Sequence, residues 1–181
     1  MRVIKQHTIC PDRTAGLCRL ALVVLLTGLA VPVGFAADPA LKMVSAGQTI
    51  ALTSQELGLL PHTELTAFDP HEKKEHRYSG VPVRDLLSKV GIQFGEKLRG
   101  PGLRLAVMVR SKDGYSTLFA LAEFDDAFSS RTILLADGED GKPLEQHFGP
   151  LRLIAPGDKR SGRWARMVTS IEVVQFPAPA P

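Results

Sequence analysis

An alternating run of apolar and polar residues constrains the fold of this chain more than any other sequence feature. Every second position from 103 to 109 is apolar, whereas the intervening positions carry Arg104, Ala106, Met108 and Arg110. A period of two is typical of a half-buried β-strand. A Lys112-Asp113-Gly114 turn follows, so the segment 115–121 can return as the partner strand. The pattern therefore predicts an antiparallel hairpin in the middle of the chain.

Further short strands are predicted where apolar segments are bounded by Gly, Pro or charged residues. They span residues 41–44, 49–52, 63–68, 132–136, 151–155 and 167–176. The predicted helices are few and short: one follows a capping box at Thr53 and Glu56, and two others span 81–91 and 122–128. Because strands outnumber helices, the expected fold class is α+β with a β-dominated mixed sheet. The charged segment 69–77 is expected to be an exposed loop.

The first 37 residues have the composition of a secretory leader. Lys5, Arg13 and Arg19 precede an apolar run that ends at Phe35, and small residues follow it. We expect 1–37 to be a signal peptide, 38–176 to form a single domain and 177–181 to be a disordered Pro/Ala tail. Cleavage of the leader predicts a periplasmic or secreted protein, and a retained N-terminal membrane anchor is the alternative.

The charge balance and the positions of the cysteines narrow the range of partners and metal ligands that we expect. The chain has 22 Lys and Arg and 19 Asp and Glu, of which residues 1–37 hold four and one. Residues 38–181 therefore carry 18 of each sign, and this balance does not favour a nucleic-acid partner. Both cysteines, Cys10 and Cys18, precede residue 38. The predicted mature protein thus has neither a disulfide nor a thiolate metal ligand.

The segment 149–164 carries the best candidate binding site. Its apolar stretch ends at Pro156-Gly157 and opens into a loop rich in cations. Lys and Arg bind phosphate through charge-assisted hydrogen bonds. We expect this loop to form an anion-binding cleft that is bordered by the turn at 113–115 and by the loop 68–71. The candidate binding residues are Lys159, Arg160, Ser161, Arg163, Asp113 and Tyr115. A solvated hairpin is the alternative for this loop, and Trp164 is expected to pack in the core.

Several motifs occur in the order found in a known family. They are Gly80-Val-Pro-Val-Arg-Asp-Leu-Leu87, Ser111-Lys-Asp-Gly-Tyr-Ser116, Leu134-Leu-Ala-Asp-Gly138, Gly149-Pro-Leu-Arg-Leu-Ile154 and Pro156-Gly-Asp-Lys-Arg-Ser-Gly-Arg-Trp164. Together they resemble the molybdopterin-binding domain of the sulfite oxidase family, over roughly residues 41–174. The resemblance implies that the basic loop holds a pyranopterin and its phosphate. It also implies oxidoreduction of a small oxyanion or sulfoxide.

The chain departs from this family at the metal. Catalytic members place a cysteine thiolate on molybdenum in a loop after the strand that ends here near Phe68, whereas this chain has Asp69-Pro-His71. Asp69 or His71 could supply an oxygen or nitrogen ligand instead. No catalytic residue is assigned, and no haem or flavin motif is present. The alternative is a non-catalytic periplasmic module that binds a small anionic ligand or a membrane redox or sensor partner.

Two other constellations favour structural explanations. Asp69, His71, Glu72, Glu75 and His76 are ligand types for zinc, but their spacing matches no established motif. We therefore predict a charged loop there and no metal site. Ser111 and Asp113 lie beside a glycine turn without the Gly-x-Ser-x-Gly element of hydrolases, so turn formation explains them.

Overall fold

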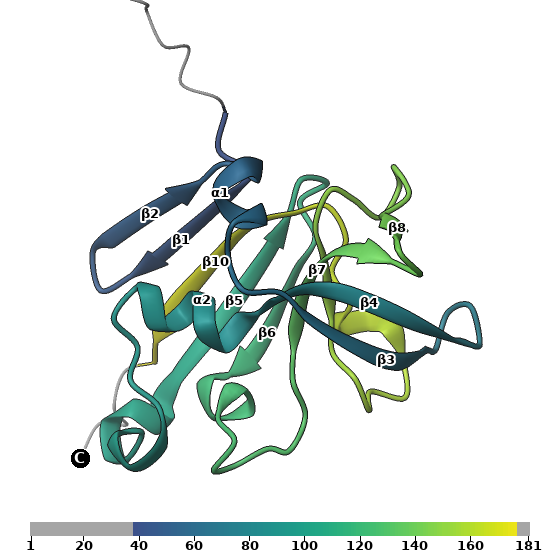
Figure 1. Ribbon diagram of the computed structural model, residues 1–181. Coiled ribbons are helices and arrows are strands. Elements are labelled where there is room, and N and C mark those ends of the chain that lie inside the picture. Colours follow the sequence, from purple (N-terminus) through teal and green to yellow (C-terminus); the bar gives the residue numbers. More distant parts are fainter. Residues whose placement is uncertain (1–37, 177–181) are drawn as a thin grey trace, which may run out of the picture. The chain divides into compact units, whose positions relative to one another are not determined.

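The computed structural model describes residues 38–176, so the predicted leader and Pro/Ala tail lie outside the described residues. The strands form two sheets (Figure 1). The first sheet has the order β2 (Gln48–Leu52), β1 (Leu41–Ser45), β10 (Val168–Gln175), β5 (Leu105–Ser111) and β6 (Ser116–Ala120). The second has the order β3 (Thr63–Asp69), β4 (Lys74–Pro82), β7 (Leu134–Glu139) and β8 (Lys142–Pro143), with β9 (Arg152–Ile154) also paired to β7.

The first sheet is mixed, as expected for the predicted fold class. β1 and β10 run parallel, whereas β2, β5 and β6 pair antiparallel with their neighbours. The predicted central hairpin is confirmed, because β5 and β6 pair directly. Gly114 adopts the positive φ (85°) that this tight turn requires, and glycine takes that conformation without steric cost.

The helices are short. α1 (Ser54–Gly58) begins at the predicted capping box: Glu56 N–H donates to Thr53 Oγ1 at 3.2 Å, and Thr53 N–H donates to Glu56 Oε2 at 2.8 Å. α2 (Val83–Lys89) buries Val83, Leu86 and Leu87. The remaining helices are the 3₁₀ turns η1 (Gly95–Lys97), η2 (Gly100–Arg104), η3 (Leu121–Phe124) and η4 (Ser161–Arg163). Among the described helices, none has the length and apolarity needed to span a bilayer.

One hydrophobic core joins the two sheets and α2. It includes Leu41 of β1, Leu87 of α2, Val107 of β5, Leu134 of β7 and Ile171 of β10, each at most 1% exposed. Burial of these side chains is the main favourable contribution to folding. The fold class inferred from strand and helix patterns is therefore confirmed.

The prediction of an exposed loop at 69–77 was wrong. β3 continues to Asp69, and β4 begins at Lys74, so only residues 70–73 form the connection. Asp69 is 0% exposed and His76 is 6% exposed, although both are polar. Polar groups can be buried when ionic and hydrogen-bonding partners satisfy them. Those partners come from β7, β9 and the turn after β7, which the local sequence does not reveal.

Two other boundaries differ from the sequence prediction. The helix expected at 122–128 is only the 3₁₀ turn η3, after which Asp125 accepts backbone hydrogen bonds from Gly95 and Ala127. The strand expected at 132–136 is β7, which begins at Leu134 and extends to Glu139, where it pairs with both β8 and β4. Hydrogen bonds from distant segments contribute to both differences: Gly95 N–H binds Asp125, and β4 pairs with β7 as far as Glu139.

Candidate functional site

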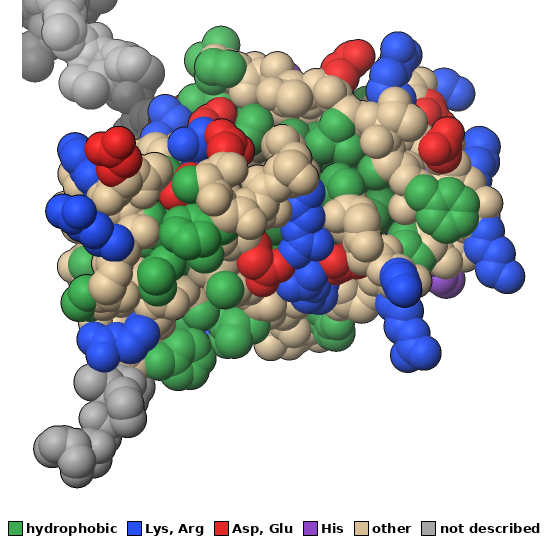
Figure 2. Space-filling view, turned by 90° about the horizontal axis from the view of Figure 1, so that it is seen from below, with side chains coloured by type: hydrophobic (Ala, Val, Ile, Leu, Met, Phe, Trp, Pro, Cys, Tyr) green, Lys and Arg blue, Asp and Glu red, His purple; other side chains and the backbone are tan. Residues whose placement is uncertain are grey.

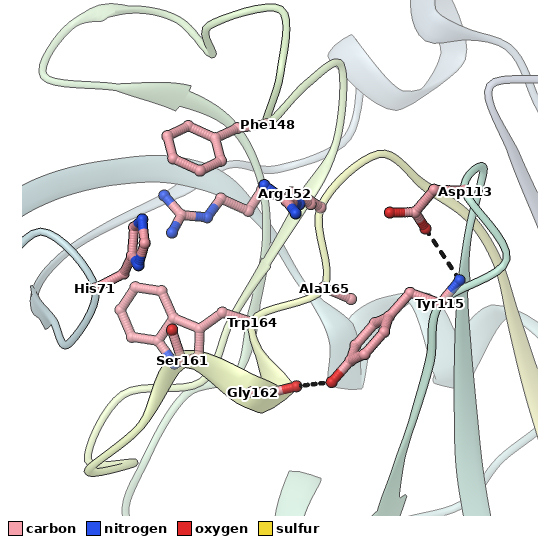
Figure 3. A pocket seen from close by; sticks show the side chains of 10 residues that line it. His71, Asp113, Tyr115, Phe148, Arg152, Ser161, Gly162, Trp164 and Ala165 are labelled. Atoms are coloured by element: carbon pink, nitrogen blue, oxygen red, sulfur yellow. Dashed lines mark hydrogen bonds between the residues drawn. The ribbon is translucent and has the colours of Figure 1, made fainter.

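A pocket of about 230 Å³ lies where several connecting segments meet (Figure 3). It is lined by His71, Asp113, Tyr115, Phe148, Arg152, Ser161, Gly162, Trp164, Ala165 and Arg166. These residues come from the β3–β4 turn, the β5–β6 turn, the segment around β9 and the segment around η4. We refer to this cavity as the Arg152 pocket.

Arg152 is the central cation of this pocket. Its guanidinium extends between the rings of Phe148 and Trp164, toward His71 (Figure 3). Its Cζ atom is 4.0 Å from the Phe148 ring centroid and 5.4 Å from that of Trp164, so both rings make cation–π contacts. Arg152 is 2% exposed, and its Nε and Nη1 atoms have no hydrogen-bond partner among the described residues. Nη1 lies 3.7 Å from Glu139 Oε2, beyond hydrogen-bond distance. Buried N–H groups are normally paired, so Arg152 has two donors without the hydrogen bonds that they usually make.

Asp69 is the anionic partner of Arg152. Arg152 Nη2 donates to Asp69 Oδ2 at 2.6 Å, while His71 N–H donates to Asp69 Oδ1 at 2.7 Å. Burial alone would raise the pKa of Asp69, but these hydrogen bonds and the guanidinium charge outweigh it and lower the pKa. Asp69 is therefore a buried carboxylate that stays ionised.

Three of the six residues proposed from the sequence lie in the Arg152 pocket. Asp113 Oδ1 accepts the Tyr115 N–H at 3.0 Å, which shapes the β5–β6 turn. The Tyr115 hydroxyl donates to the carbonyl oxygen of Gly162, and this bond links the turn to η4 (Figure 3). Ser161 begins η4 and also lines the cavity. The structure thus brings Asp113, Tyr115 and Ser161 together from positions almost 50 residues apart.

The other three proposed residues lie elsewhere. Arg163 donates to Asp158 at 2.7 and 2.8 Å and to Glu123 at 3.0 Å, and it stacks on Phe119. The hydrogen bonds to Asp158, followed by those to Glu123, raise the pKa of Arg163 despite its partial burial. Lys159 and Arg160 are exposed, and neither lines the Arg152 pocket. Arg163 therefore already has carboxylate partners.

Sequence reasoning missed Arg152 although a signal for it was present. Arg152 is the single charged residue in an otherwise apolar run from Leu151 to Ala155. An isolated charge within a buried strand indicates a paired or functional group, because its desolvation must be compensated. Phe148 and Arg166 were also missed, and they carry no comparable local signal.

The surface around the core is mixed in charge. On the face shown in Figure 2, Lys and Arg side chains are interspersed with Asp and Glu. This distribution agrees with the balanced composition of residues 38–181. Anion recognition must therefore come from individual side chains such as Arg152 and not from a broad basic surface.

A family model described as the oxidoreductase molybdopterin binding domain matches residues 43–181. The chain belongs to this family. Its resemblance to the sulfite oxidase type, inferred from the ordered motifs, is thereby confirmed. No curated protein matches the sequence.

The fold of this molybdopterin-binding domain is similar to that in the crystal structure of the sulfane dehydrogenase SoxCD from Paracoccus pantotrophus. The TM-score is 0.58 and the sequence identity is 18%. The match covers 74% of this chain but only 37% of the SoxCD chain. At this identity the similarity establishes a shared fold.

The described residues fit one part of the cofactor that the family name implies. Arg152 lines a pocket and has two N–H groups that make no hydrogen bond among the described residues, and guanidinium groups are common partners of phosphate. They offer no thiolate ligand for the metal of that cofactor, because residues 38–176 contain no cysteine. At the end of β3, where catalytic members carry the thiolate, Asp69 is committed to Arg152.

Proposed function

We propose that this protein is an exported binding domain that takes an anionic, phosphorylated ligand of the pterin class in the Arg152 pocket. The observation that carries the proposal is the buried Arg152 side chain, whose Nε and Nη1 atoms make no hydrogen bond within the described part of the chain. A buried cation with unsatisfied donors is costly unless something else pairs with it. The family membership suggests that the partner is a pterin phosphate.

The walls of the Arg152 pocket suit a flat aromatic ligand with an anionic end. Phe148 and Trp164 provide ring faces, and exposed Arg166 adds a second cation at the rim. Ser161 and Tyr115 add hydroxyl groups, which can orient a polar ring edge. Because ligand pockets usually measure 300–1,000 Å³, this smaller cavity is expected to seat only the phosphate-bearing end. Exposed Lys159 and Arg160 are proposed to approach the remaining part of the ligand.

We do not propose that this domain catalyses a reaction by itself. A bound molybdenum cofactor would supply a metal centre for oxidoreduction of a small oxyanion or sulfoxide. This chain provides no thiolate to complete the ligand set, and Asp69 at the corresponding place is neutralised by Arg152. This ion pair favours the second candidate function, a non-catalytic periplasmic ligand-binding or sensory module. Its ligand would be a small anion, and its partner a membrane redox or sensor protein.

The first experiment separates these two candidates. The protein is purified from its native periplasm, and its molybdenum content and the fluorescence of oxidised pterin are measured. Stoichiometric molybdenum with pterin supports an oxidoreductase-like domain. Pterin without molybdenum supports ligand binding without the metal. If protein from a cofactor-competent host lacks both, pterin binding is refuted.

The second experiment tests the position of the site. Arg152→Lys keeps a positive charge beside Asp69 but replaces the planar guanidinium group by an ammonium group, which cannot form paired hydrogen bonds to a phosphate. Retention of the phosphorylated ligand should therefore fall at least about tenfold. Lys42→Ala is the matched control, because Lys42 is an exposed cation on β1 that does not line the pocket. Circular dichroism melting confirms that both variants are folded. Equal retention in the two variants would place the site elsewhere.

A further inference from the structure

A second polar cluster lies beyond the Arg152 pocket and has no role in the proposed function. It consists of Glu72 in the β3–β4 turn, His76 on β4 and Glu139 at the end of β7. Their potential ligand atoms all lie within 4.8 Å of one another. Antiparallel pairing places Tyr78 opposite Glu139 and thereby brings β7 to the His76 end of β4.

The orientation of the His76 ring provides a second, independent indication of a ligand. Its Nδ1 atom lies 2.8 Å from Asp140 Oδ2 and 3.0 Å from Glu139 Oε1, and only the contact with Asp140 has hydrogen-bond geometry. Asp140 Oδ1 also accepts the Arg77 N–H at 3.0 Å. Asp140 is therefore held in place and can fix the ring with the proton on Nδ1. Metal-binding histidines almost always donate their other ring N–H to such a carboxylate.

The opposite ring nitrogen is the free coordination site. His76 is 6% exposed, and its Nε2 atom has no hydrogen-bond partner among residues 38–176. Nε2 nevertheless lies 3.0 Å from Glu72 Oε2, without hydrogen-bond geometry. A buried imidazole nitrogen that faces a carboxylate oxygen in this way is arranged for a shared cation.

The charge balance of the cluster also favours a cation. Three carboxylates surround the His76 ring: Glu72 Oε2 lies 3.0 Å from Nε2, whereas Glu139 Oε1 and Asp140 Oδ2 lie 3.0 and 2.8 Å from Nδ1. Arg152 contributes only a distant contact, with Nη1 3.7 Å from Glu139 Oε2. Even a protonated imidazole therefore leaves a surplus of negative charge, which a divalent ion would offset.

We propose that Glu72, His76 Nε2 and Glu139 bind a divalent transition-metal ion of the zinc class, with Asp140 as the residue that positions His76. Binding requires the Glu139 carboxylate to turn from its contact with Nδ1 toward the ion. Imidazole nitrogen and carboxylate oxygen are both common zinc ligands. Three protein ligands leave a fourth position for water or an exogenous group. Glu72 is 35% exposed at its side chain, so the ion can enter from solvent. The site needs no pterin, and none of its three proposed ligands lines the Arg152 pocket, although Glu139 lies 3.7 Å from Arg152 Nη1.

Metal titration of the chelator-treated protein tests this proposal. Isothermal titration with Zn²⁺ should give one equivalent, and Co²⁺ should give visible absorption bands typical of tetrahedral or five-coordinate nitrogen and oxygen ligation. Glu72→Gln should weaken binding at least about tenfold without unfolding the protein, since Glu72 lies in a turn. Asp140→Asn should weaken it about 10- to 100-fold, as expected for a residue that orients a metal ligand.

The control is the exposed pair formed by His147 and Glu145, which are 3.3 Å apart. His147→Ala should leave the stoichiometry and affinity unchanged, whereas His76→Ala should abolish binding. The proposal is overturned if wild-type protein binds no zinc. It is also overturned if Glu72→Gln and His147→Ala change the affinity equally, because binding would then be adventitious surface coordination.

Discussion

Arg152 and Asp69 form a buried ion pair that joins β9 to the end of β3, with Nη2 2.6 Å from Oδ2 and both side chains at most 3% exposed. The pair connects two strands that are more than 80 residues apart in sequence. It also places a carboxylate where the family resemblance predicts a metal-ligating thiolate. The same contact therefore bears on both stability and ligand binding.

Removing one partner of this pair should be strongly destabilising. Asp69→Ala leaves the Arg152 charge buried without its counter-ion, so the free energy of unfolding should fall by about 3–5 kcal/mol. Urea denaturation followed by circular dichroism measures the change. The double variant Asp69→Leu with Arg152→Met removes both charges and should lose less stability. A single variant as stable as wild type would show that the pair does not support the fold.

The contacts of Asp158 predict a dependence of stability on pH. Burial would raise the pKa of Asp158, but hydrogen bonds from Arg163 and Arg131 outweigh it and lower the pKa below its usual value of 3.8. A lowered folded-state pKa contributes stability above pH 3.8 that is lost as the pH falls through the folded-state value.

Asp158→Asn should therefore cost about 2 kcal/mol at pH 6, and this difference should shrink toward pH 3. Unfolding free energies at the two pH values check the prediction. The exposed residue Asp113 offers a control, because Asp113→Asn retains a side-chain oxygen for the Tyr115 N–H. A difference for Asp158→Asn that grows on acidification would contradict the prediction.

Gly80 should not tolerate a side chain. A Cβ atom there would lie 2.2 Å from the carbonyl oxygen of Leu135 and 2.5 Å from Ala136 Cα, because β4 and β7 approach closely at a register shift. Gly80→Ala should therefore lower stability by more than about 3 kcal/mol, since backbone must move. Gly58→Ala, which meets no atom within 4 Å at the end of α1, should be neutral or slightly stabilising. Thermal melts compare the two; similar melting temperatures would refute the prediction.

The Trp164 side chain should contribute more stability than the Tyr115 hydroxyl. Trp164 is 5% exposed, and its Nε1–H donates to the Ala155 carbonyl at 2.9 Å. Trp164→Phe leaves that carbonyl only the longer hydrogen bond from Asp158 N–H, at 3.5 Å, and should cost about 1 kcal/mol or more. Tyr115→Phe removes a hydrogen bond from a side chain that is 48% exposed, so water can replace it at little cost. In chemical denaturation, Trp164→Phe should lose more unfolding free energy than Tyr115→Phe. A larger loss for Tyr115→Phe would contradict the prediction that the buried hydrogen bond contributes more than the exposed one.

The hairpin around Gly114 and the capping box at Thr53 could be predicted because each depends on residues adjacent in sequence. The core position of Trp164 was also predicted, and the structure confirms it. The segment 69–77 could not be predicted, because the partners that bury Asp69 and His76 lie more than 60 residues away. Composition alone makes such a segment indistinguishable from a solvated loop.

The sequence by itself determined that the domain is rich in strands and has short helices. The alternation of apolar and polar residues and the positions of turn residues show this, because they follow from local backbone preferences and the burial of apolar faces. The ordered motifs determined the family resemblance. Tertiary structure alone decided which cations face the pocket. Arg163 is bound by Asp158 and Glu123, whereas Arg152 pairs with Asp69 through Nη2 and lines the pocket with two N–H groups that make no hydrogen bond among the described residues. The physical reason is that the availability of a charge depends on the groups that the fold brings around it, and sequence neighbours do not identify those groups.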